Sequence, residues 1–503
     1  MPSPPEKHCQ KTATLAAALK RPDVYRWIIT NGYFPESYVL PPCFTVSKYP
    51  DYGKKYYAHT RKTFSPPLRE YLQVHFPKTE LTDRTFGIID PELHSDISLT
   101  IARNWKSFLR VVFHPQNKVY AYSFPVSLDR QRSGKTGRLR SGRLIYEFIE
   151  MAESDLAAVA YKFNFLFITD VKNFYPSLYT HSIAWAIHGK KNIRKPANRH
   201  DYRFYGNRLD KLFQNTNDGC TNGLPIGPVV SDLIAELVLA AVDRILSRNL
   251  SSEVLVVRFK DDYRILARTE QEGRSVVKAL QAALKEFRLE LNDEKTEVHK
   301  LPDGLFRSWV SEYNAANPYP KKYYGLKRFK EIYLAVVSID RRHPGTGVID
   351  RFLADLVKKD YTLRIRLDGS SIPRVVSLLL MLANLRTKVF PKVLAIIEAM
   401  LRSAKGMAHS HEIESHLVGY LAELSTRESE NRYLISWIYY FLRANGLDGD
   451  LSAIPHPTHP IPRAVRTSRF PEFKHATDFD LFRGVKTVSK KVSMLEHLDI
   501  FKR

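Results

Sequence analysis

The stretch from Val256 to Leu266 reads VVRFKDDYRIL and places two adjacent carboxylates, Asp261 and Asp262, between two short apolar runs. The runs, residues 254–260 and 263–267, are rich in aliphatic and aromatic side chains, which predicts a β-hairpin with both acids at its tip. Considered alone, such a tip is better explained as a solvated turn. A role for the acids therefore depends on which other charges the fold brings beside them.

A second predicted strand also ends in an acid. In YKFNFLFITDV, residues 161–171, Phe side chains alternate with other residues at period two until Asp170. If this strand lies beside the hairpin, Asp170, Asp261 and Asp262 converge, and three carboxylates at close range are stable only with a divalent cation among them. Two Mg²⁺ ions, or Mn²⁺ in their place, would suit nucleotidyl transfer: one activates a 3'-hydroxyl, and the other neutralises charge on the pyrophosphate.

The segments around these strands predict an alternating order of strands and helices. Helices are expected over 143–160, within SLYTHSIAWAIHGK (177–190) after a hydroxyl cap, over 229–248, and over a segment with an apolar face from Val277 to Phe287. GLPIGP, residues 223–228, predicts a turn. A last short strand is expected in LELNDEKTEVHKL, residues 289–301.

The rest of the chain divides by composition. The first hundred residues are rich in proline and aromatics, which predicts irregular packed structure with few long helices. After about residue 345, four helical segments predict stacked hairpins, alternatively a small helical repeat, although no named repeat motif is present. We expect an N-terminal segment over 1–145, a central domain over 146–340, and a helical domain with a basic tail over 341–503.

Charge indicates the class of partner. The 503 residues include 77 Lys and Arg against 53 Asp and Glu, a net charge of +24 that attracts polyanions. Nucleic acid is favoured over an anionic membrane surface. No apolar run reaches the roughly 18 residues needed to span a bilayer, and no apolar stretch follows the N-terminus as in a signal peptide, so we expect a cytoplasmic protein with no membrane partner. Three widely spaced cysteines, at positions 9, 43 and 220, predict free thiols.

Three segments together carry a family resemblance. FITDVKNFYPSLYTHSIAWAIHGK (167–190), GLPIGPVVSDLIAELVLAAVD (223–243) and RFKDDYRIL (258–266) resemble, in that order, motifs A, B and C of reverse transcriptases. They are most similar to the bacterial defence-associated, abortive-infection type. GYFPESYVLPPCF (32–44) and RSGRLIYEFIEMAE (140–153) resemble the same group, so the similarity covers about residues 20 to 300.

The resemblance implies a right-hand polymerase of the α+β class, with fingers and a ferredoxin-like palm, followed by an all-α domain. Asp170 and Asp261 would be metal ligands, Asp262 the third acid, and Tyr175 a steric gate against a ribose 2'-hydroxyl, with a core tyrosine as the alternative. Gly227 and Pro228 would let the backbone approach the nucleotide. Lys295 would protonate the pyrophosphate, unless it is a solvated lysine.

Basic residues fit a path for nucleotide and nucleic acid. Within and just after SLDRQRSGKTGRLRSG (127–142), six basic side chains occur between positions 130 and 143 with no acid among them, and the resemblance puts them where triphosphate and template are gripped: Arg130, Arg132, Lys135, Arg138, Arg140 and Arg143. A second basic run extends from Lys190 to Lys211. The alternative for both is a solvated loop.

The sequence also departs from the family pattern. Ile226 replaces the glutamine of retroviral enzymes, which puts ordinary template reading in doubt, and Phe259 and Lys260 precede the acids of motif C. Lys260 either pairs with a primer or template phosphate or is directed away from the site. Four tyrosines in the C-terminal helices, Tyr420, Tyr433, Tyr439 and Tyr440, are candidate priming hydroxyls, but core packing explains them better.

The resemblance therefore implies an RNA-directed DNA polymerase that makes cDNA from deoxynucleoside triphosphates in antiphage defence. It further implies an RNA template or associated non-coding RNA and a homo-oligomer. The alternatives are a template-independent or protein-primed DNA polymerase of the same family, or a catalytically silent RNA-binding sensor. An RNA-dependent RNA polymerase or a cyclase is disfavoured by Tyr175 and by the lack of a GGDEF-like turn.

Overall fold

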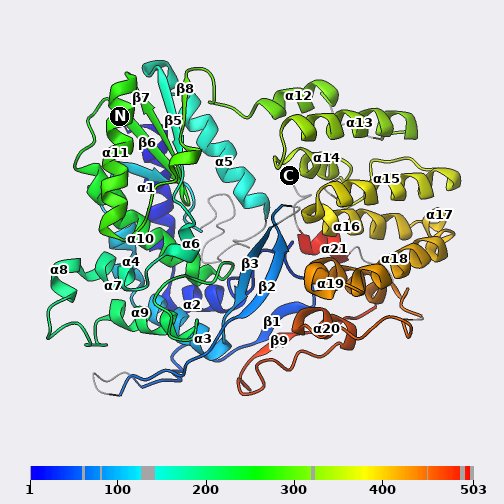
Figure 1. The fold of residues 1–503 in the computed structure, drawn as a ribbon, viewed down its shortest axis with the longest axis horizontal. Helices are drawn as coiled ribbons and strands as arrows, with labels where there is room; N and C mark the ends of the chain where they lie inside the picture. The colour runs from blue at the N-terminus through cyan, green and yellow to red at the C-terminus, as the bar shows by residue number, and fades with distance from the viewer. Residues whose placement is uncertain are drawn as a thin grey trace.

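A five-stranded mixed sheet lies at the centre of one half of the molecule (Figure 1). The computed structural model describes residues 2–58, 63–79, 82–125, 142–318, 323–358, 360–449, 451–487 and 493–498. The strand order is β4-β6-β7-β5-β8, with β4 parallel to β6 and the other pairs antiparallel. The strands are β4 (Val119–Ala121), β5 (Phe165–Thr169), β6 (Val254–Phe259), β7 (Asp262–Ala267) and β8 (Glu297–Lys300).

Period-two alternation explains why the sheet is buried on both faces. Phe167 and Ile265 face a large hydrophobic cluster with the inner helices, whereas Leu166 and Leu266 face a smaller cluster that includes Leu156 of helix α5 (Gly142–Ala157). The strand ending before Asp170, the hairpin and the last short strand are confirmed. Strand β4 was not predicted from the sequence, because three residues are too few to show a period.

Helices cover the sheet. The longest of them, α10 (Val229–Ser247), is buried along almost its whole length, as its apolar sequence predicts. Helix α11 (Glu270–Glu286) begins with a capping box formed by Thr269 and Glu272. The predicted hydroxyl cap of helix α7 is wrong, because the side chain of Thr180 caps no backbone N–H there. The remaining helices of this part are α6 (Phe174–Ser177), α7 (His181–His188), α8 (Lys190–Ile193), α9 (Tyr205–Asn215) and the 3₁₀ turns Ala160–Lys162 and Asp293–Lys295.

The N-terminal hundred residues are more regular than predicted. They contain helices α1 (Pro4–Ala17), α2 (Arg21–Thr30) and α3 (Pro91–Arg103), and strands β1 (Phe44–Lys48), β2 (Leu72–Pro77) and β3 (Asp83–Ile88); helix α4 (Trp105–Val112) follows. The prediction of few long helices is wrong because each of these first three helices has proline in its first turn. Proline lacks the N–H that is unpaired there anyway, so it starts a helix as readily as it breaks one.

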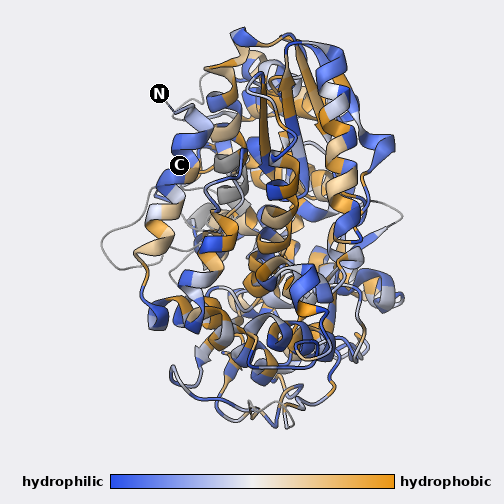
Figure 2. Ribbon diagram, turned by 90° about the vertical axis from the view of Figure 1, so that its left-hand side faces the viewer, coloured by the Kyte–Doolittle hydropathy of each residue, from blue (hydrophilic) through white to orange (hydrophobic). Residues whose placement is uncertain are grey.

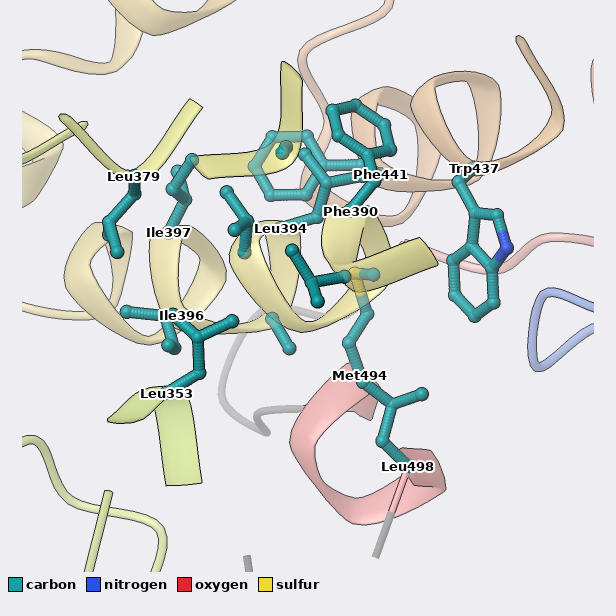
Figure 3. Close-up of a cluster of buried hydrophobic side chains, with 14 of the residues drawn as sticks. Leu353, Leu379, Phe390, Leu394, Ile396, Ile397, Trp437, Phe441, Met494 and Leu498 are labelled. Atoms are coloured by element: carbon teal, nitrogen blue, oxygen red, sulfur yellow. The ribbon is translucent and has the colours of Figure 1, made fainter. Parts of the chain in front are cut away.

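A lobe of helices lies on the other side of the β2–β3 hairpin (Figure 1). The four helical segments predicted after residue 345 are confirmed as α15, α16, α18 and α19. Figure 3 shows how α16 packs against α19 and against Met494 and Leu498 of α21. The elements are α12 (Ser308–Ala316), α13 (Leu326–Arg342), α14 (Val348–Asp355), α15 (Ile372–Leu385), α16 (Phe390–Leu401), α17 (Ala404–Met407), α18 (Ser410–Ser425), α19 (Glu428–Asn445), α21 (Ser493–Leu498) and the 3₁₀ turns Gly369–Ser371 and Thr387–Val389.

The segment after α19 returns to the N-terminal region. Helix α20 (Pro460–Thr467) packs on α19, and strand β9 (Asp480–Phe482) pairs antiparallel with β1. In Figure 2 the hydrophobic stretches of inner strands and helices are flanked by outer segments that are mostly hydrophilic. The three cysteines are free, as predicted. Among the described residues, no helix is both long enough and apolar enough to cross a membrane.

Candidate active site

The hairpin tip holds its first acid on a strained turn. Strands β6 and β7 pair up to Phe259 and Asp262, which leaves Lys260 and Asp261 as the turn. Lys260 has a φ of 52°, a left-handed conformation that non-glycine residues seldom adopt. Its N–H donates to Ser123 Oγ at 2.7 Å, and its carbonyl accepts from Arg258 Nη1 at 2.9 Å. These two hydrogen bonds fix the backbone that carries Asp261.

A buried charge network supports this turn from below. Arg258, 1% exposed, donates to Glu236 Oε2 at 3.1 Å and to Asp243 Oδ2 at 3.0 Å, and both acids lie on α10. Tyr263 Oη donates to Asp243 Oδ1 at 2.9 Å. Removing one member of such a network leaves a buried charge without its partner, which is strongly destabilising. The network therefore locks the hairpin onto α10.

Asp170 lies beside the hairpin tip, as the sequence predicts. Strand β5 pairs with β7 up to Thr169 and Tyr263, and the N–H of Val171 donates to the carbonyl of Asp261 at 3.2 Å. On the other side, the carbonyl of Asp170 accepts from the N–H of Asn292 at 2.8 Å. The backbone of Asp170 is thus held between the hairpin and the segment that leads to β8.

The three carboxylates interact electrostatically, and the ammonium group of Lys295 pairs with one of them. Lys295 Nζ donates to Asp170 Oδ2 at 2.8 Å, and this hydrogen bond raises the pKa of Lys295. Desolvation raises the pKa of Asp261, and the negative charge of Asp170 raises it further. The positive charges of Lys260 and Arg84 act in the opposite direction and lower this pKa. The surrounding protein, followed by the charges of Asp261 and Asp170, raises the pKa of Asp262 to about 6. Asp170 thus raises the pKa of both hairpin acids.

The residue types at this tip fit a divalent cation. Asp170 Oδ1 is buried without a hydrogen-bond partner, and carboxylate oxygens are the ligands that Mg²⁺ and Mn²⁺ prefer. As the side chains lie, no three His, Cys, Asp or Glu residues in the described part of the chain form a ready arrangement for a metal ion. Lys295 occupies the other oxygen of Asp170. The carboxylate oxygens are suitable ligands for Mg²⁺ or Mn²⁺. The described side chains do not surround a common metal position as they lie.

Tyr175 and Lys260 meet at a residue that the sequence reasoning missed. Tyr175 of α6 is 9% exposed, and its hydroxyl donates to Asp232 Oδ1 at 2.6 Å. Lys260 Nζ lies 3.6 Å from Asp232 Oδ2. Asp232 stands in the first turn of α10, where an acid is usually explained by the helix dipole, so no separate pattern in the sequence pointed to it.

The turn before α10 brings the β2–β3 hairpin to the site. Gly227 has a φ of 119°, and a Cβ at this position would lie 2.9 Å from Pro35 Cγ and 3.1 Å from Phe86 Cδ1. The carbonyl of Ile226 accepts from the N–H of Gly87 at 2.8 Å, and Pro228 is the N-cap residue of α10. Glycine at 227 therefore allows β3 to pack closely against the turn.

Most of the basic residues that the sequence predicts to bind triphosphate and template lie outside the described part of the chain. Arg130, Arg132, Lys135, Arg138 and Arg140 lie outside the described residues, and Arg143 lies in α5 with its side chain undescribed. The structure adds Arg84 instead, an exposed residue of β3 whose charge acts on Asp261. The sequence offered only a lone arginine in TDRTFGI, which did not single it out.

One known protein family matches the part of the chain that contains this site. Residues 140–327 match the family described as reverse transcriptase (RNA-dependent DNA polymerase). The match spans Asp170, Asp261, Asp262 and Lys295 and defines the class, that of the nucleotidyltransferases. More particularly, the protein is an RNA-directed DNA polymerase with a reverse transcriptase domain, and such domains generally use divalent metal ions.

Solved structures to which this chain is distantly similar include telomerases. Apo telomerase from Candida tropicalis is 9% identical, with a TM-score of 0.35 over 75% of this chain and 70% of that chain. The same protein truncated from its C-terminal domain is 11% identical, with a TM-score of 0.32 over 48% and 52%. Telomerase from Candida albicans in complex with a TWJ fragment of telomeric RNA is 11% identical, with a TM-score of 0.28 over 67% and 62%. These sequence identities and TM-scores are too low to assign roles to residues of this chain. No curated protein matches.

Proposed function

We propose that this polymerase copies RNA into cDNA in antiphage defence, with Asp170, Asp261 and Asp262 holding two Mg²⁺ ions. The observation that carries the proposal is the meeting of the β5 end with the β6–β7 tip, where three carboxylates interact and Lys295 pairs with Asp170. Magnesium bound there would supply charge neutralisation and activation of a 3'-hydroxyl. On this reading the sheet is the palm, and the β2–β3 hairpin belongs to the fingers.

The chain's own residues would orient the substrates. Tyr175, held at its hydroxyl by Asp232, would exclude a ribose 2'-hydroxyl by bulk. Lys295 would release Asp170 and give a proton to the leaving pyrophosphate, and its raised pKa keeps it protonated until then. Gly227 and Pro228 would shape the wall beside the base, and Arg84 would meet the triphosphate.

The defence role rests on sequence resemblance alone. FYPSLYTHS (174–182) followed by HGK (188–190) is typical of the abortive-infection group. Membership would imply a non-coding RNA partner, action in the cytoplasm and a homo-oligomer. The net charge of +24 supports RNA binding, because Lys and Arg neutralise phosphates without reading bases.

The test is DNA synthesis by the purified protein with its co-purifying RNA, each labelled nucleotide, and Mg²⁺ or Mn²⁺. We expect deoxynucleotide incorporation, and we expect Asp261→Ala to lower it by roughly 10²-fold or more while the fold is retained. Asp303→Ala, an exposed acid in the turn after β8, is the matched control and should stay active.

The same assay separates the alternatives. Product that survives removal of RNA indicates template-independent synthesis, and label that stays bound to denatured protein indicates protein priming. RNA binding with no product under either metal would contradict the proposal and favour a silent sensor.

A further inference from the structure

A small arginine-lined pocket lies between the N-terminal helices and α9, built from residues that the polymerase site does not use. Its volume is about 100 Å³. Helix α3, the turn before α4, and α9 with the loop before it supply its lining: Leu99, Thr100, Arg103, Asn104, Tyr202, Arg203, Tyr205 and Arg208. Three guanidinium groups and two tyrosines around one small cavity are an unusual lining for a hydrophobic core.

The innermost arginine has unused hydrogen-bonding capacity. Arg208 is 1% exposed, donates from Nη2 to Asp96 Oδ2 at 3.0 Å and from Nε to Thr100 Oγ1 at 3.2 Å, and stacks over the ring of Phe64. Its Nη1 is buried with no hydrogen-bond partner. A buried donor left unpaired is costly and therefore rare, so it marks a place where an acceptor is expected.

Positive charge exceeds negative charge around the pocket. Arg103 donates to the carbonyl of Gly53, a neutral group, and Arg203 at the rim pairs with Asp201. Desolvation lowers the pKa of Lys55, and the nearby charges of Arg103 and Arg208 lower it further. Among the described residues that line the pocket or act on its lining, the cations outnumber the acids: Lys55, Arg103, Arg110, Arg203 and Arg208 against Asp96, Asp201 and Asp210.

The loop that leads into the pocket is also basic and exposed. Between α8 and α9, exposed side chains include Arg194, Lys195, Arg199 and His200, and Lys191 of α8 is exposed beside them. In this loop the acid Asp201 is buried, where it binds Arg203. This is the second basic run of the sequence, and the structure connects it to the pocket through Tyr202 and Arg203.

We propose that this pocket binds one phosphate group, either of a nucleic-acid strand that follows the basic loop or of a free phosphate ion. Guanidinium groups match the oxygens of phosphate with charge-assisted, paired hydrogen bonds, and tyrosine hydroxyls can add donors. A phosphate would balance the charge excess of Arg103, Arg208 and Lys55. The inference does not depend on the polymerase roles assigned above.

The test is equilibrium dialysis of the full-length protein with labelled inorganic phosphate at low salt. We expect about one saturable phosphate per chain, and Arg103→Ala and Arg203→Ala should each weaken binding roughly tenfold, as the loss of one charge-assisted hydrogen bond predicts. Arg194→Ala removes a cation of the same loop that does not line the pocket and should change affinity little. Arg84→Ala, beside the polymerase acids, should also bind normally.

Competition with a single-stranded RNA oligonucleotide distinguishes the two sources. If the pocket holds a strand phosphate, RNA displaces the label, and Arg103→Ala reduces the salt dependence of RNA binding by about one phosphate. If it holds a free ion, RNA leaves the label in place. The proposal is overturned if wild type binds no saturable phosphate, or if the Arg103→Ala, Arg203→Ala double variant binds it as tightly as wild type.

Discussion

At the scale of single residues, Asp232 connects three segments that are far apart in the sequence. It accepts a hydrogen bond from Tyr175 and lies within ion-pair distance of Lys260, so α6, α10 and the hairpin turn meet at one carboxylate. A tyrosine ring with a fixed hydroxyl cannot swing aside, and a rigid ring excludes a bulky sugar better than a mobile one. Asp232 is therefore expected to act on sugar choice through Tyr175.

This arrangement predicts a graded series of variants. Tyr175→Val should raise ribonucleotide incorporation relative to deoxynucleotide by roughly 10- to 100-fold, because the bulk of the ring is lost. Tyr175→Phe keeps the ring and should keep most of the selectivity. Asp232→Ala, which frees the hydroxyl, should fall between them. Single-nucleotide incorporation ratios measure the series, and an unchanged ratio in Tyr175→Val would leave Tyr175 with a packing role only.

The acids predict a pH-dependent response to metal. The pKa of Asp262 is raised to about 6 in the folded protein, above its unfolded value, so without metal its contribution to stability is complete below pH about 4 and is lost as pH rises through 6. Metal binding needs the ionised form, so Mg²⁺ should raise the melting temperature more at pH 7.5 than at pH 5.5.

Asp262→Asn is the check on that response. Without metal at pH 7.5 it should melt higher than wild type, since a repelling charge is removed, and its response to Mg²⁺ should be small at both pH values. A full Mg²⁺ response in this variant would contradict a metal role for Asp262.

At the scale of elements, the sequence predicted the parts whose periodicity is strong. The alternation of apolar and other residues identified β5 and the β6–β7 hairpin. The acids that interrupt these apolar runs marked the strand ends, so the positions of Asp170 and Asp261 could also be predicted. Asp232, Arg84 and Arg258 could not be found in this way, because their importance lies in contacts across segments. The N-terminal helices were missed because their prolines start them. The division at residues 145 and 340 stays a prediction.

Helix α11 packs closely on β5 at Gly273, so one added methyl group at this position should change stability strongly. A Cβ at Gly273 would lie 1.9 Å from Phe167 Cε2, and Phe167 lies three residues before Asp170. Gly273→Ala should therefore lower the free energy of unfolding by about 1–3 kcal/mol through overpacking. It should also reduce DNA synthesis, because β5 must shift.

The matched control is Gly419→Ala in α18, where a Cβ meets nothing within 4 Å. At this exposed position of α18, the change from glycine to alanine should stabilise the protein by about 0.5–1 kcal/mol. Denaturant unfolding of both variants, with DNA synthesis measured in parallel, tests the pair. Equal effects at the two positions would mean that α11 and β5 have more room than their packing indicates.

At the scale of the whole molecule, residues 468–483 join the C-terminal lobe to the N-terminal region. Strand β9 pairs with β1, His475 Nε2 lies 2.7 Å from Asp90 Oδ2, and Asp478 binds both Lys54 and the hydroxyl of Tyr56. Phe479 packs against both large hydrophobic clusters, the one among the C-terminal helices and the one beneath the sheet. Composition could not predict this docking, because the pairing partners are at least 385 residues apart in the sequence.

Phe479 therefore predicts whether the two halves unfold together. Phe479→Ala removes apolar contacts from both clusters at once, so it should lower the free energy of unfolding by about 1–3 kcal/mol and speed hydrogen exchange in β1 and β9. Phe306→Ala, at a side chain that is 61% exposed, is the matched control and should change neither quantity appreciably. Hydrogen exchange in Phe479→Ala should stay slow in β6 and β7, because the Arg258 network holds the hairpin on α10 independently of this segment. If Phe479→Ala and Phe306→Ala show the same hydrogen exchange, residues 468–483 are attached only at the surface. The two halves are then held together by the β2–β3 hairpin, through its contacts with α19 and with the turn before α10.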